Sequence, residues 1–423
     1  YTAQQLIQNN FVEGCVEVSN ITSNTNGSVN GFNSFAYFER DLSNFPFENG
    51  IMLSTGDAVS GGNAINTNLL NEGETSWGTD PDLEAALGIT NTLNATTIEF
   101  DFVSITNLIQ FNYLLASEEY HANFPCDYSD GFAFLIREAG TSDPYQNIAL
   151  IPGTSIPVNT NTIHDEIVGF CPAENDAYFD GYSMGDTNYN GRTTVLTASA
   201  NIAPNVQYHI KLVIADQTDE NYDSAVFIQG NSFNPTVELG PDVSTCADVY
   251  TIDGDVQNPL ATYAWYRDGV LLPTELNPTL NVTQTGTYTV EISIPLNNMN
   301  CVIDDDIEIA LNSVQNANPL TDYELCDDIS GDGIEVFDLN TKDAEAEAAV
   351  AAGNYSISYH YSFADSQNNT NAITTAISNT TNPQSIYVRI IDVDTGCLAY
   401  TSFNLIVNEL PDIVAPTAME VCD

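Results

Sequence analysis

Apolar and polar residues alternate along most of this chain. In residues 97–103 the apolar side chains Ile98, Phe100 and Phe102 fall on one face of an extended strand and polar side chains fall on the other. The same period of two recurs at residues 109–115, 130–137 and 209–215, and further strand-like runs lie at residues 15–19, 34–38, 50–54 and 224–229. Because loops rich in Asn, Gly and Pro separate these runs, the first half of the chain is predicted to form a jelly-roll-like β-sandwich.

Helical patterns are short and few. Residues 2–10, 80–88 and 343–352 have the spacing or the end signals of a helix, such as Pro81 in a first turn and Gly88 after a last one. The fold class predicted for the whole chain is therefore all-β. Several domains are expected because 423 residues are too many for one core.

The chain divides into consecutive units. A β-sandwich head is predicted at residues 1–233, an immunoglobulin-like β-sandwich at 234–313 and a β-rich repeat domain at 314–410. The repeat domain carries Tyr-Glu-Leu-Cys-Asp at 323–327, and Met-Glu-Val-Cys-Asp ends the chain, each after a proline. Residues 411–423 are therefore expected to begin a further copy within a longer tandem array.

The immunoglobulin-like prediction comes from Cys246, Trp265 and Cys301, which lie among short strands. In antibody domains the second cysteine lies two residues after a corner tyrosine. Here Cys301 lies well beyond Tyr288, so a Cys246–Cys301 bridge would join other strands.

The charge of the chain excludes several kinds of partner. It has 58 acidic residues against 7 Lys and Arg, a formal net charge of −51. Nucleic acids are excluded because their phosphates need basic contacts, and anionic membrane surfaces would repel the chain. No run of about 20 apolar residues is present, so direct membrane insertion is not expected. Hydrophobic residues make up 43%, too many for a disordered acidic chain.

The cysteines indicate an oxidising compartment. They stand at 15, 126, 171, 246, 301, 326, 397 and 422, without a Cys-x-x-Cys pair that would suggest zinc. Structural disulfides are expected from these wide spacings. Cys126–Cys171 is the preferred pair in the head, leaving Cys15 as a buried thiol. Cys326–Cys397 is the preferred bridge of the repeat domain, with Cys422 left without a partner, although spacing does not fix the connectivity.

Acidic residues crowd one part of the head. An acidic loop joins the runs at 209–215 and 224–229, and adjacent acids follow the run at 109–115. Such crowding costs repulsion unless a cation lies among the carboxylates, and the chain has few basic residues. We therefore expect a Ca²⁺ site with ligands from Glu118, Glu119, Asp130, Asp216, Asp219 and Asp223. The alternatives are a solvated hairpin tip and carboxylates that cap backbone amides.

A second acidic loop lies in the repeat domain. Asp328, Ser330 and Asp332, followed by glycine, match the first half of an EF-hand Ca²⁺ loop. The twelfth position holds Leu339 instead of an acid, and Asp338 comes one residue early. The hypothesis is a variant calcium loop that uses Asp328, Ser330, Asp332 and Asp338. The alternative is an Asp/Gly turn between strands.

Catalysis has little support in the sequence. The histidines at 121, 164, 209 and 360 show no pattern of partners. Glu118 and Glu119 are adjacent, whereas a glycosidase needs two carboxylates that face each other across about 5–10 Å. We expect no enzyme activity, with a carbohydrate-active enzyme as the alternative.

Several motifs, in order, resemble a known family. They are YTAQQL at 1–6, FENGIMLSTG at 47–56, IQFNYLLASEEY at 109–120, DGFAF at 130–134, NIALIPG at 147–153 and DGY at 180–182. With these motifs, residues 1–233 resemble the choice-of-anchor L domain of secreted bacterial surface proteins. The Cys-Asp-Asp, Asp-Gly and Phe-Asp-Leu motifs at 326–339 are similar to units of very large gliding-motility adhesins.

The resemblance implies a location and a role. Such adhesins are secreted by the type IX system and stand at the cell surface, associated with the outer membrane. The expected function is a non-enzymatic adhesin of a gliding bacterium, whose distal head binds polysaccharide or another surface ligand through many weak contacts. Contacts with the secretion and gliding machinery would lie outside this stretch of chain. The alternative is a filament spacer without a ligand of its own.

Overall fold

The computed structural model describes the chain except residues 13–14, 63–68, 74–75, 297–298, 313–316 and 412–423. Contacts between residues divide it into two compact units. The first unit comprises residues 1–239, 253–280 and 289–306, and the second comprises 240–252, 281–288 and 307–423. The Met-Glu-Val-Cys-Asp motif that was expected to open a further repeat lies outside the described residues.

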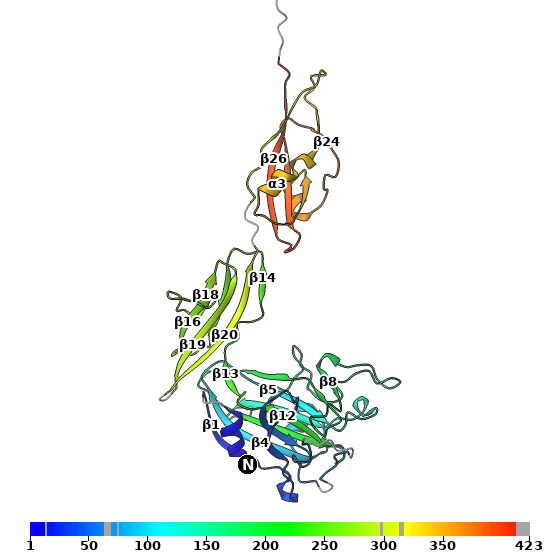
Figure 1. Cartoon of the computed structure of the whole chain (residues 1–423), viewed down its shortest axis with the longest axis vertical. Helices are drawn as coiled ribbons and strands as arrows, with labels where there is room; N and C mark the ends of the chain where they lie inside the picture. Colours follow the sequence, from blue (N-terminus) through cyan, green and yellow to red (C-terminus); the bar gives the residue numbers. More distant parts are fainter. Residues whose placement is uncertain (13–14, 63–68, 74–75, 297–298, 313–316, 412–423) are drawn as a thin grey trace, which may run out of the picture. The chain divides into compact units, whose positions relative to one another are not determined.

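Two β-sheets build the predicted head (Figure 1). One sheet has the order β1 (Val16–Thr22), β4 (Thr92–Ser104), β11 (Gln207–Gln217), β6 (Gly131–Glu138) and β7 (Gln146–Asn147). The other has the order β2 (Phe35–Glu39), β3 (Asn49–Ser54), β12 (Ser224–Gln229), β5 (Leu108–Ser117), β9 (Gly191–Thr193) and β8 (Phe179–Tyr182). Strands β10 (Leu196–Asn201) and β13 (Asn234–Thr236) also pair with β5.

Aromatic side chains from both sheets form the core of the head. Strand β4 contributes Phe100 and Phe102, and β5 contributes Phe111, each at most 1% exposed. The residues that alternate with these phenylalanines on β4, Glu99 and Asp101, remain partly exposed, as the alternation predicts. Full burial of one such ring stabilises the fold by about 1.5–3 kcal/mol, so this core holds the strand ends of both sheets in place.

The helices are short: α1 (Ala3–Leu6), α2 (Pro81–Leu87), α3 (Asp343–Ala348) and α4 (Phe363–Asn368). The helix predicted at 80–88 is present. The Asp80 side chain accepts a hydrogen bond from the Leu83 amide at 2.8 Å, and Gly88 ends the helix with a φ of 68°. At the N-terminus, a wider turn at Ile7–Phe11 replaces the second half of the expected helix.

A further sheet carries the immunoglobulin-like features. Its order is β14 (Val243–Thr245), β20 (Met299–Leu311), β19 (Gly286–Leu296), β16 (Thr262–Arg267) and β17 (Val270–Leu272), with β15 (Tyr250–Asp253) pairing β18 (Thr279–Val282) beside it. Trp265 is fully buried, and its indole N–H donates to the Asn277 carbonyl at 2.9 Å. The Tyr288 hydroxyl donates to the Gln284 carbonyl at 2.6 Å, as a corner tyrosine does in this fold.

The last sheet has the order β21 (Tyr323–Cys326), β26 (Leu398–Asn408), β25 (Gln384–Asp392) and β23 (Tyr355–His360), and β22 (Val336–Phe337) pairs with β24 (Ile377–Ser378). It shares one feature with the immunoglobulin-like sheet. In both, the first strand pairs in parallel with the last, β14 with β20 and β21 with β26. The prediction of an all-β, multidomain fold is confirmed.

Candidate functional site

Acidic residues at four strand ends of the head are shielded from solvent. Asp216 lies near the end of β11, Asp223 directly precedes β12, Glu118 and Glu119 follow β5, and Asp130 precedes β6. Their exposed fractions run from 0% to 7%. We call these residues the head acid cluster. It contains every expected head ligand except the acid at position 219, which is exposed.

Hydroxyl and amide groups hold one side of the head acid cluster. The Ser224 hydroxyl donates to Asp130 Oδ2 at 2.6 Å, and the Gln217 amide donates to Asp130 Oδ1 at 3.3 Å. The Asp130 amide and the Thr160 hydroxyl donate to Glu119 Oε2 at 2.9 and 3.2 Å. These carboxylates therefore act as hydrogen-bond acceptors inside the fold.

The other side of the cluster also accepts from backbone. The Glu72 amide donates to both oxygens of Asp223, at 3.0 and 3.2 Å, and the Leu70 amide donates to Glu118 Oε1 at 3.3 Å. Asp216 Oδ2 accepts from the side-chain amide of Asn94 at 2.8 Å. The backbone-capping alternative thus describes several of these contacts.

Two oxygens of the cluster are left over. Glu118 Oε2 and Asp216 Oδ1 are buried and have no hydrogen-bond partner among the described residues. A buried carboxylate oxygen without a partner is costly, so these atoms are where a bound proton or cation would lower the free energy.

Burial governs the protonation of the cluster. It raises the pKa of Glu118, of Glu119 and of Asp223 to about 7. It also raises the pKa values of Asp130 and Asp216 well above the usual range, and the neighbouring carboxylates add to that rise. Two buried basic residues of the head contact acids outside the cluster: Lys211 Nζ lies 3.1 Å from Asp80 Oδ2, and the Arg192 guanidinium contacts Asp180 and Asp186 at 2.7 and 2.8 Å.

The second acidic loop brings together a different set from the expected one. Asp338 caps the turn Leu339–Lys342 through the Asn340 amide at 3.2 Å, and Ser330 and Asp332 are exposed. Asp328 instead lies with Asp327 and Glu335, one carboxylate oxygen of each falling within 4.8 Å of the others. Within the described ranges, no other set of acids, histidines and cysteines meets that spacing in a group of three.

Sequence reasoning passed over Asp327 and Glu335 because the EF-hand pattern samples every second residue. The signal that could have found Asp327 is the adjacent acid pair that ends β21. Glu335 could not be found from the sequence, because it comes close to Asp328 only when the loop between them folds back.

The cysteines of the head form the expected bridge and an unexpected one. Cys126 and Cys171 are bonded, with their Cα atoms 5.8 Å apart. Cys15, expected as a buried thiol, is bonded to Cys301, with their Cα atoms 5.7 Å apart. The expected Cys246–Cys301 bridge is therefore wrong.

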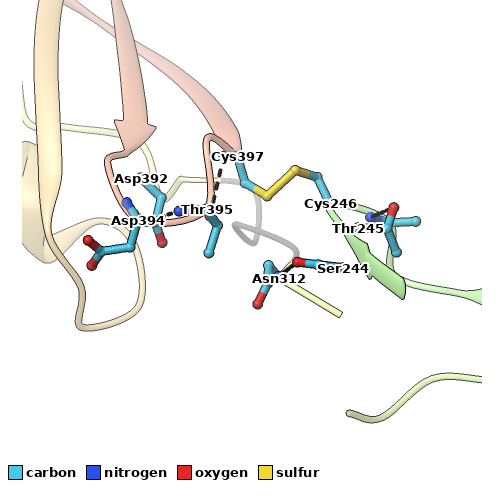
Figure 2. Close-up of a disulfide and its surroundings, with 9 residues drawn as sticks. Ser244, Thr245, Cys246, Asn312, Asp392, Asp394, Thr395 and Cys397 are labelled. Atoms are coloured by element: carbon cyan, nitrogen blue, oxygen red, sulfur yellow. Dashed lines mark hydrogen bonds between the residues drawn. A yellow bond between two sulfur atoms is a disulfide. The ribbon is translucent and has the colours of Figure 1, made fainter. Parts of the chain in front are cut away.

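The remaining described cysteines also depart from expectation. Cys246 is bonded to Cys397, and Cys326 is an exposed free thiol, so the expected Cys326–Cys397 bridge is wrong. Figure 2 shows that the bonded cysteines come from the end of β14 and from the turn before β26. Thr395 Oγ accepts from the Cys397 amide at 3.3 Å, which holds that turn.

Strand register explains both errors. Thr245 pairs with Leu311, and Cys326 pairs with Asn408, in parallel ladders. Cys301 lies ten residues before Leu311 on the same strand, so it is roughly 33 Å from that register position. Cys397 stands at the far end of β26 in the same way. A disulfide requires Cα atoms about 4.4–6.8 Å apart, so neither expected pair can form.

Grooves flank β2, the edge strand of its sheet. Tyr37 borders both grooves. One encloses about 240 Å³ and is also lined by Phe38, Arg40, Phe45 and Asp186. The other encloses about 710 Å³ and is also lined by Tyr1, Asn26, Ser28, Phe32 and Asn33. Aromatic faces beside hydrogen-bonding groups are the surfaces on which polar ring-shaped ligands bind.

Fold and covalent links together define a class: an all-β, multidomain protein in which two long-range disulfides, Cys15–Cys301 and Cys246–Cys397, link segments next to different β-sheets. None of the described helices is long and apolar enough to cross a membrane. Residues 1–234 match the model of the choice-of-anchor L domain, and residues 322–411 match that of the Flavobacterium inter-domain disulphide bond domain. The chain belongs to the choice-of-anchor L family, and both matches point to an extracellular or cell-surface protein. Neither is the model of an enzyme family.

No curated protein matches the chain. Solved structures similar to it include three N-terminal domains of the outer capsid protein Hoc of bacteriophage RB49, at 9% identity over 75% of this chain and 94% of that chain, with a TM-score of 0.17. The N-terminal four immunoglobulin domains of Dscam1 match at 8% identity over 75% and 80%, with a TM-score of 0.16. A β-1,2-glucanase from Parabacteroides distasonis matches at 8% over 65% and 36%, with a TM-score of 0.15. At such scores these likenesses carry no functional argument.

Proposed function

We propose that this chain is part of a cell-surface adhesin whose head binds polysaccharide or another external surface ligand. The observation that carries the proposal is the pair of grooves beside β2, which combine aromatic rings with amide, hydroxyl and charged groups. Export by type IX secretion and a link to the gliding machinery belong to the same proposal. Their support is the resemblance of the repeat domain to gliding-motility adhesins.

Tyr37 is the residue best placed to contact a ligand. Its ring lies 5.4 Å from that of Tyr1, centroid to centroid, and its hydroxyl donates to Glu39 Oε1 at 2.8 Å. An aromatic face with a fixed polar edge suits the apolar face and the hydroxyl groups of a sugar ring. Repetition of such contacts along a surface would give adhesion by multivalency rather than by one tight site.

Glycan-array binding of the chain, compared with its Tyr37→Ala variant, tests the proposal. Loss of the stacking face is expected to weaken binding by about tenfold or more, the effect of losing about 1.4 kcal/mol. Tyr361→Ala is the matched control, because Tyr361 is 51% exposed and belongs to the second unit. If the unaltered chain binds no polysaccharide or surface, the spacer function is the better account.

A spacer role draws support from the disulfides. Cys246 and Cys326 occupy the same position in their domains, at the end of a first strand that pairs in parallel with the last. Cys301 and Cys397 also correspond, since each lies where the last strand begins. We propose that Cys326 bonds to the cysteine of a following domain that corresponds to Cys397, continuing the series.

Non-reducing peptide mapping of the protein isolated from cells tests this pairing. A peptide containing Cys326 is expected to be cross-linked to a peptide from a later repeat. Recovery of Cys326 as an alkylated thiol would contradict the proposal, while the Cys246–Cys397 peptide pair serves as the internal control.

Calcium in the head acid cluster remains a proposal as well. It is supported by the orphaned oxygens of Glu118 and Asp216 and by the shortage of basic partners. A hard divalent cation accepts carboxylate oxygens as ligands and would offset the desolvated charge of the cluster.

A further inference from the structure

The turn that follows β21 gathers three carboxylates. Asp327 and Asp328 come directly after the strand, and Glu335 directly precedes β22. One oxygen of each lies within 4.8 Å of the others. Asp327 is buried, Asp328 is exposed and Glu335 is intermediate, so the group opens to solvent on one side only.

Asp327 has an oxygen without a partner. It is 6% exposed, and its backbone amide donates to the Asn408 carbonyl at 2.8 Å, which fixes the residue at the end of the ladder. Its Oδ2 accepts from the Gly333 amide at 2.9 Å. Its Oδ1 is buried and has no hydrogen-bond partner among the described residues. Such an atom needs a donor or a cation.

The chain segments that carry the other two carboxylates are held by contacts of their own. Asp328 Oδ1 accepts from the Ser330 amide at 2.7 Å. Asn379, 3% exposed, accepts from the Glu335 amide at 2.8 Å and donates to the Gly333 carbonyl at 2.9 Å. The backbone that carries Glu335 is therefore placed by a buried side chain, so the group is pre-organised rather than gathered by chance.

Among the described residues, no Lys, Arg or His forms an ion pair with any of these three carboxylates. Lys342 is engaged by Glu345 Oε2 at 2.7 Å and by the Thr321 carbonyl, also at 2.7 Å. The group therefore concentrates negative charge, and Asp327, one of its three members, also carries the unpartnered buried oxygen.

We propose that Asp327, Asp328 and Glu335 bind a divalent cation of the calcium type. Ca²⁺ takes oxygen ligands at about 2.3–2.6 Å, so two oxygens on opposite sides of it are at most about 5 Å apart, which the 4.8 Å grouping satisfies. Water would complete the coordination on the open side. The ligand set replaces the EF-hand-like one that the sequence suggested, and it does not depend on whether the head binds a glycan.

Hydrogen exchange of the full chain, with CaCl₂ or with chelator, tests the site. Ca²⁺ is expected to slow exchange at the amides of residues 328–335 by about tenfold or more, with an affinity on the order of 10⁻⁴–10⁻³ M, as in extracellular modules. The double variant Asp327→Asn with Glu335→Gln is expected to lose this protection. The matched control is Asp332→Asn, an exposed acid of the same turn, which is expected to keep it.

Peptides from β5 and β12, read in the same experiment, separate this site from calcium bound in the head. Unchanged exchange at 328–335 on adding Ca²⁺ would overturn the proposal, and so would equal protection in the double variant. If the double variant loses protection across β25 and β26, and so has not folded, the single Glu335→Gln variant takes its place. Glu335 is partly exposed, so the fold is expected to tolerate that change.

Discussion

At the scale of single residues, the head accommodates buried ionisable side chains in two ways. Arg192 meets Asp180 and Asp186 in ion pairs. Among the described residues the head acid cluster has no such ion-pair partner, and its carboxylates accept hydrogen bonds from hydroxyls and amides and have raised pKa values. The first arrangement is stable over a wide pH range, whereas the second depends on protons or cations.

The acid cluster predicts a pH dependence. Folded pKa values near 7 lie above those of the unfolded chain, so this stability is fully present below pH 4 and is lost as the pH rises through 7. With chelator, the opening free energy of β5 and β12 is expected to fall by at least about 2 kcal/mol between pH 5 and 8. Hydrogen exchange at the amides of β5 and β12, corrected for the intrinsic exchange rate at each pH, measures this opening free energy.

Asp223→Asn is expected to make that decline shallower, because one titrating carboxylate is removed while the acceptor for the Glu72 amide is kept. Asp219→Asn is the matched control from the same loop, since Asp219 is exposed. If the opening free energy falls equally steeply with pH in the Asp223 variant, the Asp223 carboxylate does not contribute to the pH dependence.

The ion pairs predict a large loss on removing one partner. Arg192→Met leaves Asp186 buried without its cation, which is expected to cost about 3–5 kcal/mol of head stability in urea unfolding. Arg40→Met removes an exposed pair with Glu48 and is expected to cost no more than about 1 kcal/mol. Similar losses in the two variants would contradict this account.

At the scale of elements, strands were predictable where one face is buried. The alternation around Phe100 and Phe102 located β4, and the end signals Pro81 and Gly88 located α2. Within the candidate sites, the acids at the ends of β5, β6, β11 and β12 were also found from the sequence. Only the folded sheets reveal that these ends are buried, because burial depends on the opposite sheet.

The disulfides show what local pattern cannot supply. Cys246 and Cys301 have a spacing typical of an immunoglobulin-like domain, yet the parallel register of β14 with β20 keeps them at different ends. The registers of non-local strand pairs are set by packing over the whole sheet, so the sequence spacing of two cysteines does not predict them. For the same reason the partner of Cys15 could not be predicted.

One element-scale prediction concerns the corner tyrosine. Tyr288→Phe removes the hydroxyl that donates to Gln284, and it is expected to cost about 1 kcal/mol. Urea unfolding followed by Trp265 fluorescence measures this loss of stability. All proteins compared carry Trp77→Phe, which removes the other tryptophan. Tyr361→Phe, at an exposed position, should leave the transition unchanged. An equal effect of the two changes would argue against a corner role.

At the scale of the whole molecule, the acidic composition makes cations a general stabiliser. Addition of about 10 mM Ca²⁺ is expected to raise the melting temperature of the chain by several degrees relative to chelator, since a ligand that binds only the folded state stabilises it. NaCl at equal ionic strength controls for screening. No difference between Ca²⁺ and chelator would count against calcium in both the head acid cluster and the turn at 327–335.

Of the disulfides between described cysteines, Cys15–Cys301 and Cys246–Cys397 enclose the longest segments, and these segments overlap in sequence. Under tension, force would pass through the sulfur bridges rather than through the enclosed chain. Between Cys15 and Cys397 the shortest covalent route then contains only the 56 residues from 246 to 301. Even fully unravelled, this span would stretch by roughly 190 Å rather than by more than about 1200 Å. The oxidised protein would thus behave as a tether of fixed maximum length. Reduction of the two disulfides would allow the enclosed segments to extend as well.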